Sequence, residues 1–331
     1  MTASSGVTRA ETRTVLESAA RASLRAPSVF NTQPWSWRIT GDAMELWADP
    51  DRYLEATDPE GRLLLISLGA ALHHARTALA AAGWSVTVDR LPDQQQPELT
   101  ARVRLSGRVP ADPEAQLLVA AIIRRRTDRR AFGGRPVAEQ TITALRRLVE
   151  AEGAYLHLVP HDQVPTLALA AEHAGDAERR DPAYRSELTG WTNRPAWTGD
   201  GVPPATAVQP ALRRVPVRDF SPDGSAGLTA GDDHDQGAAY VVLFGTGDQP
   251  VDLLRGGEAL SALLLSATAE GLSTAPLSDV VEVGWPRHLL RDLLSFVGEP
   301  YVAVRLGYVE STDQLPVTPR RAATEVIRID E

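Results

Sequence analysis

The chain has no cysteine among its 331 residues, which excludes disulfides, thiolate metal sites and cysteine nucleophiles. It has no lysine either, because all 34 basic residues are arginine, so a Schiff base, a P-loop lysine and a lysine general base are excluded as well. With 43 acidic residues the formal net charge is −9, which argues against general nucleic-acid binding. Any redox chemistry would therefore need a cofactor.

Signals for export and for membrane insertion are also missing. Residues 1–14 show neither the apolar core nor the cleavage pattern of a signal peptide. The most apolar stretch, 63–72, is about half of the roughly 20 residues that a membrane span needs. We therefore expect a cytoplasmic protein of one or two domains, with a large buried interior and without membrane or nucleic-acid partners.

The motifs of several large enzyme classes do not occur, among them G-x-G-x-x-G, the P-loop, H-E-x-x-H and G-x-S-x-G. The acidic run DDHD at 232–235 resembles a metal site, but neighbours in one glycine-rich loop cannot easily converge on an ion. We expect a solvated loop there. His73 and His74 lie about 100° apart on a helix, which is not the spacing of helical zinc ligands. No metal site is predicted.

Hydrophobic periodicity predicts helices and strands in two groups separated by a long polar stretch. The segment from 191 to 236 is rich in proline, glycine and aspartate, which indicates a functional or disordered loop. Helices are expected over 10–25, 63–82, 138–151, 163–180, 253–270 and 287–296, and another from residue 113 into the arginine cluster at 124–130. Strands are expected over 35–40, 44–48, 84–91, 99–105, 154–159, 239–245 and 301–309.

Two of the predicted helices carry the same pattern of glycines. Gly69 is followed by Gly83, and Gly257 by Gly271, with an offset of 188 between the pairs. Such an internal repeat predicts two related halves, which we place at 1–110 and 111–331. Because alanine-rich helices often end in glycine, chance similarity is the alternative.

Two segments have unusual chemistry. In APSVFNTQPW, residues 26–35, two prolines stiffen the backbone around several polar side chains; this suits a planar heterocycle, or else a capped turn that satisfies its own backbone. Residues 124–130 include five arginines, whose mutual repulsion suits an anionic partner. A solvated helix end that complements the macrodipole is the alternative. The residues alone leave both alternatives open.

The turn APSVFNTQPW resembles the A-P-S-x-x-N-x-Q-P-W signature of the nitroreductase family, whose members bind flavin mononucleotide (FMN) at a homodimer interface. The run RRTDRRAF at 125–132 is similar to the family's R-x-S-x-[RK]-x-F phosphate segment, and GLSTAPLSD at 271–279 is similar to its later turn beside the flavin ring. In ordinary members the arginine segment precedes the A-P-S turn. Here it follows, as in the Acg-type branch, in which one chain carries two nitroreductase-like halves.

The resemblance implies an α+β, nitroreductase-like fold in which two related halves form an intrachain pseudo-dimer. Each half would hold a mainly antiparallel sheet flanked by helices. Since the second half has no counterpart of APSVFNTQPW, one FMN per chain is expected. A fused pseudo-dimer could function as a monomer.

The resemblance also implies the site residues. Flavin N5 would carry the chemistry, so no catalytic side chain is expected. The register of the arginine segment is open between Arg125 with Arg129 and Arg126 with Arg130, because the run has one residue too many to match both ends of the pattern. The implied cofactor-binding residues are Pro27, Ser28, Asn31, Gln33, Arg125, Arg126, Thr127, Arg129, Arg130, Pro276, Leu277, Ser278, Asp279, Arg320 and Arg321.

The function implied is that of an FMN-dependent oxidoreductase, which accepts hydride from NAD(P)H at flavin N5 and reduces a nitroaromatic, a quinone or a related small molecule. One alternative is an FMN-sequestering protein, in which the segment 191–236 covers the flavin as a lid through Trp191, Trp197 and Phe220. A dedicated biosynthetic flavin oxidase or dehydrogenase is the other.

Overall fold

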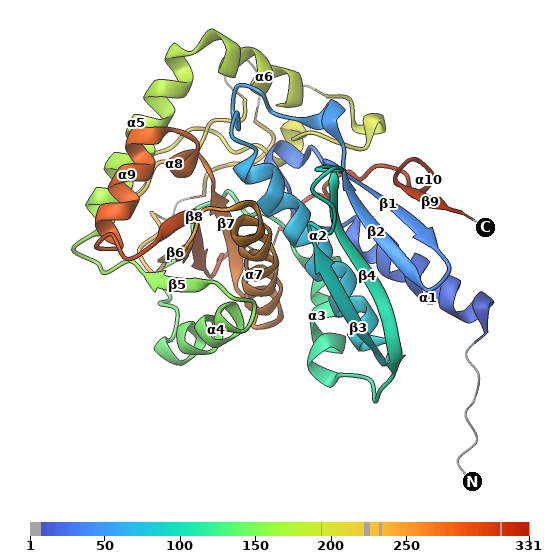
Figure 1. The fold of residues 1–331 in the computed structure, drawn as a ribbon. Coiled ribbons are helices and arrows are strands. Elements are labelled where there is room, and N and C mark those ends of the chain that lie inside the picture. Colours follow the sequence, from blue (N-terminus) through green and yellow to red (C-terminus); the bar gives the residue numbers. More distant parts are fainter. Residues whose placement is uncertain (1–7, 193, 222–225, 232–233, 312, 331) are drawn as a thin grey trace.

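Two mainly antiparallel sheets flank a central pair of helices in the computed structural model, which describes residues 8–192, 194–221, 226–231, 234–311 and 313–330 (Figure 1). The helices are α1 (Arg9–Ser23), α2 (Arg62–Ala81), α3 (Pro113–Arg124), α4 (Glu139–Ala151), α5 (Val164–Arg180), α6 (Pro182–Thr192), α7 (Pro250–Ala269), α8 (Asp279–Glu282), α9 (Gly284–Leu293) and α10 (Ala323–Val326). The strands are β1 (Trp35–Thr40), β2 (Ala43–Ala48), β3 (Trp84–Arg90), β4 (Leu99–Arg108), β5 (Tyr155–Leu158), β6 (Ala239–Gly245), β7 (Ser273–Leu277), β8 (Glu299–Gly307) and β9 (Ile327–Ile329).

The first sheet has the strand order β3-β4-β2-β1-β9. Its β1–β2 hairpin turns at Gly41, whose φ of +60° favours glycine. Along β1 buried and exposed side chains alternate, so that Trp35, Trp37 and Ile39 enter the core. The chain's last strand, β9, joins this sheet in parallel to β1, and the C-terminus therefore lies beside the first half (Figure 1).

The second sheet has the order β5-β6-β8-β7, with antiparallel pairing throughout. This order matches β1-β2-β4-β3 of the first sheet strand for strand. The helices fit the same scheme, because α1 and α4 each precede a first strand and α2 and α7 each precede the last two. The predicted α+β class with two related halves is confirmed. The boundary at residue 110 stays a prediction, because β9 crosses back and α3 contacts both α2 and α7.

The two repeat glycines sit where α2 and α7 cross, and their contacts are reciprocal. A Cβ on Gly69 would lie 2.0 Å from the carbonyl oxygen of Leu254, and one on Gly257 would lie 2.1 Å from that of Ile66. These positions are related by the same offset of 188, and His73 meets its own counterpart Ser261 at 2.8 Å. Such reciprocity is the mark of a two-fold interface. The glycines are therefore needed because the two backbones touch there.

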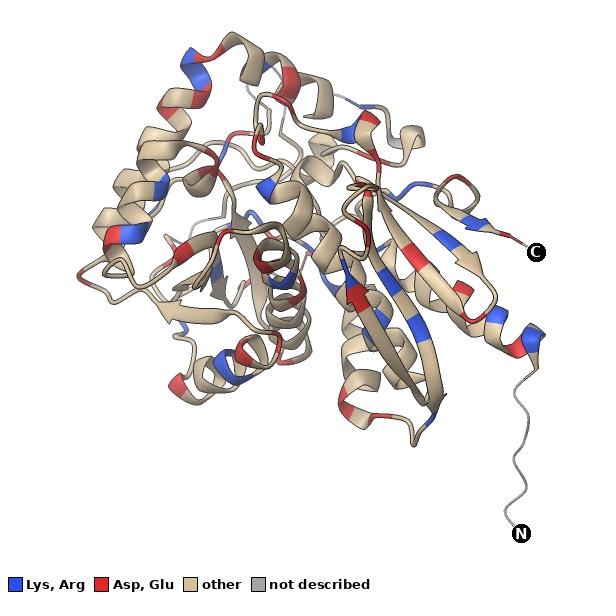
Figure 2. Cartoon of the chain, viewed as in Figure 1, with Lys and Arg blue, Asp and Glu red and all other residues tan. Residues whose placement is uncertain are grey.

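Helix α2 is long and apolar enough to cross a membrane by length and composition, but most of it is buried inside the protein. It packs against α1, α3 and α7 between the two sheets. It is thus the core helix that the sequence predicts. Figure 2 shows basic and acidic positions interspersed along the peripheral helices, α5 and α9 among them.

Several elements differ from the sequence-based expectations. Residues 273–277 form the strand β7 rather than a turn. The helix α6 lies between the expected helix over 163–180 and the expected loop over 191–236, and its last two residues fall within that loop. The run 232–235 is not simply solvated, because Asp235 is fully buried and pairs with Arg305 at 2.7 Å. Asp232 and Asp233 lie outside the described residues. No group of three or more metal-binding side chains occurs in the described part of the chain.

Candidate cofactor site and the adjoining cavity

The turn between α1 and β1 has a constrained backbone. Pro27 follows the end of α1, and the side-chain oxygen of Ser28 accepts a hydrogen bond of 2.9 Å from the amide of Gln33. Phe30, Asn31 and Gln33 have φ angles of 50°, 54° and 51°. Left-handed conformations are costly for residues with a side chain and persist where the surroundings enforce them, often at functional sites. The prolines and Ser28 thus hold a strained loop in place.

The polar side chains of this turn are engaged by two distant segments. Asn31 donates from Nδ2 to the carbonyl oxygens of Gly201 and Pro319, at 3.0 and 3.1 Å. Gln33 donates from Nε2 to the carbonyl oxygen of Gly199 at 2.8 Å, and its Oε1 accepts from the amide of Arg321 at 3.0 Å. The long segment after α6 and the C-terminal tail therefore both close on the turn.

A group of arginines faces the same turn from the start of the second half and from the tail. Arg125 is 4% exposed, and its Nε and Nη1 have no hydrogen-bond partner in the described structure. Arg320 donates from Nη1 to Oδ1 of Asn31 at 2.8 Å. Arg129 donates to the carbonyl oxygen of Thr206 at 3.3 Å. Among the described residues no carboxylate forms an ion pair with any of these three arginines.

Burial of these unpaired cations lowers their pKa values. The pKa falls to about 10 for Arg125, mainly through burial and then through the neighbouring charge of Arg126. Burial and the charge of Arg218 lower the pKa of Arg129 to about 10. For Arg320, burial and then the charge of Arg125 bring the pKa to about 9. Buried like charges are costly unless an anion compensates them, so this group is built for an anionic ligand.

The structure distinguishes the two registers of the arginine segment. Arg130 turns away and pairs with Asp128 at 2.8 Å, and this partner raises its pKa. Thr127 forms a parallel bridge with Thr274 of β7, which aligns the arginine segment along the second sheet. Arg125 and Arg129 therefore face the turn, whereas the alternative partner Arg130 does not.

One small cavity of about 60 Å³ gathers most of the predicted residues. Its lining includes eight of them, namely Pro27, Ser28, Asn31, Arg125, Arg126, Thr127, Arg129 and Arg320. Gly201, Val202 and Thr206 from the long segment line it too. Pockets for drug-sized ligands measure about 300–1,000 Å³, so with the segment 199–206 against it the small cavity is narrower than a nucleotide needs.

The remaining predicted residues lie elsewhere. Gln33 and Arg321 brace the turn from behind, where Arg321 also pairs with Asp49 at 3.1 Å. Pro276 and Leu277 belong to β7, and Ser278 precedes α8. These residues and Arg130 do not line the small cavity. Asp279 lines a larger, neighbouring cavity.

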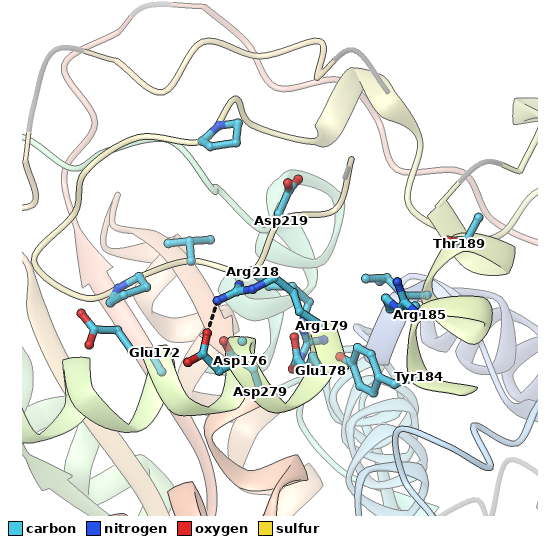
Figure 3. Close-up of a pocket in the computed structure, with 16 residues that line it drawn as sticks. Glu172, Asp176, Glu178, Arg179, Tyr184, Arg185, Thr189, Arg218, Asp219 and Asp279 are labelled. Atoms are coloured by element: carbon cyan, nitrogen blue, oxygen red, sulfur yellow. Dashed lines mark hydrogen bonds and ion pairs between the residues drawn. The ribbon is translucent and has the colours of Figure 1, made fainter. Parts of the chain in front are cut away.

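This larger cavity has a volume of about 700 Å³ and lies between α5, α6 and the segment 216–219 (Figure 3). An aromatic wall separates it from the small cavity. The ring of Phe30, which lines the small cavity, packs edge-on against Tyr184 and Phe220 at 6.4 and 6.1 Å. Tyr184 and the guanidinium of Arg218, 5.1 Å from the Phe30 ring, line the large one.

Carboxylates dominate the charge of the larger cavity's floor. Arg218 pairs with Glu178 at 3.0 Å and with Glu282 at 2.6 Å. Burial, together with the charge of Glu282, raises the pKa of Asp279 to about 6 although Arg218 opposes this. Burial likewise raises the pKa of Glu178 to about 7 against the effect of Arg218. The single positive charge of Arg218 therefore cannot neutralise Glu178, Asp279 and Glu282 together.

Sequence reasoning missed this charged group apart from Asp279. Glu178, Arg218 and Glu282 come from three segments that only the folded chain brings together, and no spacing along the sequence reveals them. Of the predicted lid aromatics, Trp191 and Phe220 pack around Phe30, whereas Trp197 is 85% exposed.

Comparison with known proteins identifies the family. The chain is 37% identical over 326 residues to "Putative NAD(P)H nitroreductase Rv3131" of Mycobacterium tuberculosis, with 96% of this chain and 91% of that protein covered. It is 36% identical over 324 residues to "Putative NAD(P)H nitroreductase acg" of the same species, covering 96% of each. The chain therefore belongs to the nitroreductase family, and its full-length similarity to the acg protein confirms the predicted Acg-type branch.

Comparisons with solved structures and with family models do not extend this assignment. NfnB of Mycobacterium smegmatis, an FMN-dependent nitroreductase solved with NADPH, aligns with a TM-score of 0.44 and 18% identity, over 66% of this chain and 100% of that chain. The NADPH:FMN oxidoreductase of Vibrio harveyi aligns with a TM-score of 0.40 and 13% identity, over 65% and 77%. No family model matches the chain.

Proposed function

We propose that this protein is an FMN-dependent oxidoreductase that takes electrons from NAD(P)H and passes them to a small-molecule acceptor. The observation that carries the proposal is Arg125, a buried guanidinium whose Nε and Nη1 have no hydrogen-bond partner among the described residues, beside Arg320 and Arg129. A dianionic phosphate monoester offers several acceptors to such a group. The names of the relatives above, which include NAD(P)H nitroreductase, support the same activity.

The described residues divide the binding task between them. Arg125, Arg129 and Arg320 would hold the phosphate and the polar edge of the isoalloxazine, while Pro27, Ser28 and Asn31 would form the wall on which the ring rests. When bound, FMN would supply two-electron chemistry that the side chains of this cysteine-free chain do not. The arginines would also stabilise negative charge in a site from which water is excluded.

A second candidate function has an observation of its own in its favour. The segment 199–206 is hydrogen-bonded to Asn31, Gln33 and Arg129 and lines the small cavity. A lid that stays closed over the flavin would make the protein an FMN store rather than a reductase. The reductase requires that this segment open for the NAD(P)H donor.

Absorption spectroscopy separates these functions. The purified protein, reconstituted with FMN, is mixed with NADH or NADPH without oxygen, and the flavin band is followed. Rapid bleaching by either donor is the result expected for the oxidoreductase. A tightly bound flavin that neither donor bleaches would favour the store, and failure to bind FMN at all would refute both.

Replacing Arg125 tests the anion site, because FMN affinity should fall while the stability of the FMN-free protein should rise. Arg125→Met should weaken FMN binding about 10- to 100-fold, because a hydrogen bond to a charged group is worth about 1.5–3 kcal/mol. The same change should raise the melting temperature of the FMN-free protein, since it removes a buried unpaired charge. Arg124→Met, at an exposed neighbouring position, is the matched control for both measurements. Unchanged FMN affinity in Arg125→Met would contradict the assignment.

A further inference from the structure

The cavity of about 700 Å³ next to the candidate flavin site has the size of a substrate chamber and a distinctive charge. Five carboxylates line it, from Glu172, Asp176, Glu178, Asp219 and Asp279, against three arginines, Arg179, Arg185 and Arg218. Glu172, Asp176 and Asp219 are solvent-accessible, and Asp176 is occupied by Arg179. The specificity of the chamber therefore depends on its buried carboxylates.

Asp279 is the carboxylate best placed to receive a ligand. It is 4% exposed and lines the cavity, and within the described residues no side chain forms a hydrogen bond or an ion pair with it. The one buried cation nearby, Arg218, is already paired with Glu178 and Glu282. A buried carboxylate without a cation is costly, and a positively charged ligand group would compensate it.

Two parts of the protein connect the large cavity with the candidate flavin site. The strand that carries Thr274, which bridges to Thr127 in the small cavity, runs on directly to Asp279. On the other side, Phe30 faces the small cavity and packs on Tyr184 of the large one. A molecule in the large cavity therefore lies one aromatic layer away from the candidate flavin site.

We propose that this cavity is the acceptor site and that it selects a small nitroaromatic molecule carrying a protonated amine, with the amine on Asp279 and Glu178 and the ring beside Tyr184. Reduction of its nitro group to a nitroso group takes up two electrons, which NAD(P)H supplies in the proposed function, and two protons, and releases water. The proposal rests on the proposed function for the role of the ligand as electron acceptor. The recognition itself does not depend on FMN. Aromatic contact supplies affinity for the ring, whereas the buried carboxylates discriminate by charge.

The groups facing Asp279 give the recognition a pH dependence. Glu282 lies on its own helix α8, Glu178 on α5, Tyr184 on α6 and Arg218 on the long segment. Since burial raises the pKa of Asp279 to about 6 and that of Glu178 to about 7, both carboxyls are largely protonated in mild acid. Affinity for a cation should therefore rise from about pH 5 to about pH 8, as these protons are lost.

A matched series of ligands tests the proposal by calorimetry on the FMN-reconstituted protein. 4-Nitrobenzylamine, 4-nitrobenzyl alcohol and 4-nitrobenzoate share the ring and differ in charge. We expect the amine to bind about 10- to 100-fold more tightly than the alcohol, and the benzoate most weakly. The preference for the amine should grow with pH, while binding of the alcohol stays constant. Equal affinities for the amine and the alcohol across the pH range would overturn the proposal.

Asp279→Asn, which preserves size, should abolish most of the preference for the amine and leave affinity for the alcohol unchanged. Asp162→Asn makes the same charge change at an exposed turn and should leave the preference intact. An Asp279→Asn protein that still prefers the amine would overturn the assignment of the carboxylate.

The test also separates this inference from the proposed function. Rapid bleaching of the flavin by NAD(P)H without any amine preference would remove the inference and leave the reductase. Amine binding that depends on Asp279, in a protein whose flavin NAD(P)H does not reduce, would keep the binding site and remove the reductase. For a working reductase, kcat/KM for the amine should fall in Asp279→Asn through KM, because binding rather than chemistry is affected.

Discussion

The two halves of the molecule share one strand order but differ in their connections, and two of these differences explain the single candidate site. In the first half, residues 24–34 join α1 to β1 and contain the strained turn, whereas in the second only residues 152–154 join α4 to β5. Conversely, Gly41 and Asp42 suffice between β1 and β2, while residues 159–238 lie between β5 and β6. The inserted segment of the second half closes over the turn of the first.

The pairing of arginines with carboxylates also differs between the short connection and the strained turn. Near the short connection 152–154, Arg76 pairs with Glu152 and Glu258, both at 2.6 Å, and Arg90 pairs with Glu258 at 2.7 Å. Arginines at this place have carboxylate partners, whereas Arg125, Arg129 and Arg320 have none within the described residues. Ion pairs between the halves thus occupy the place beside the short connection 152–154, whereas the arginines around the strained turn are left for a ligand.

The largest loss of stability is expected from substitutions at the crossing of α2 and α7, where the two halves meet. Gly69→Ala and Gly257→Ala each put a Cβ about 2 Å from a backbone oxygen of the opposite helix, which forces α2 and α7 apart. Each should lower the free energy of unfolding by more than about 3 kcal/mol. Because the contacts are reciprocal, the two losses should be similar, as measured by urea unfolding.

Gly190→Ala is the control for this pair, since Gly190 lies in α6 with no atom within 4 Å of its added Cβ. That change should stabilise the protein by about 0.5–1 kcal/mol, because alanine is the better helix former. A severe loss at one repeat glycine together with a neutral result at the other would contradict the two-fold relation.

A smaller effect is expected from breaking the ion pairs that join the two halves near residues 152–154. Glu258→Gln removes the fully buried carboxylate that serves Arg76 and Arg90, and should destabilise the protein by about 3 kcal/mol, since one partner of a buried pair is left uncompensated. FMN affinity should not change, because this network lies outside the candidate site. Glu270→Gln, at an exposed position near the end of the same helix, should have little effect in thermal unfolding. Loss of FMN binding in Glu258→Gln would mean that this ion-pair network is coupled to the candidate site.

The features that could be predicted from sequence are those with a local cause. The helix α2, the hairpin around Gly41 and the turn at 26–35 follow from periodicity, glycine and proline. The repeat glycines were found by their spacing, and the structure supplies the reason, because they lie at one helix crossing. Arg125, Arg129 and Asn31 were placed through family resemblance, and the fold brings them to one cavity.

What could not be predicted depends on contacts between distant segments. Strand β7 contains Pro276, which reads as a turn but is tolerated on the edge of a sheet. In the sequence, Asp235 belongs to an expected loop and Arg305 to an expected strand, so nothing indicates that the fold buries them as an ion pair. The floor of the large cavity also combines residues from separate elements, so its excess of carboxylates has no sequence signature.

The helix crossing also makes a prediction about pH. Burial lowers the pKa of His73 to about 4, partly offset by Glu152. Between about pH 6.5 and pH 4 the unfolded chain therefore binds a proton that the native state does not, and stability falls by up to about 3 kcal/mol as the pH falls. His73→Gln should lose less stability in acid than the wild type, although His74, whose pKa burial also lowers, retains part of the effect. Urea unfolding across this pH range measures the effect, and His161→Gln, at an exposed site, is the control that should follow the wild-type dependence of stability on pH. If His73→Gln also followed the wild-type dependence, the assignment would be contradicted.

The smallest effect concerns the lid itself. In Asn31→Ala the bonds to Gly201, Pro319 and Arg320 are lost, each worth about 1 kcal/mol net. Because these bonds tie the inserted segment and the tail to the turn rather than holding the core, global stability should change little. Local opening should increase instead, so amide exchange at Gly201, which donates to the Asn31 carbonyl oxygen, should become about 5- to 30-fold faster. Thr14→Ala, in the exposed part of α1, is the control. Unchanged exchange at Gly201 would mean that the segment is held by its apolar contacts around Phe30, and that the turn does not control access to the site.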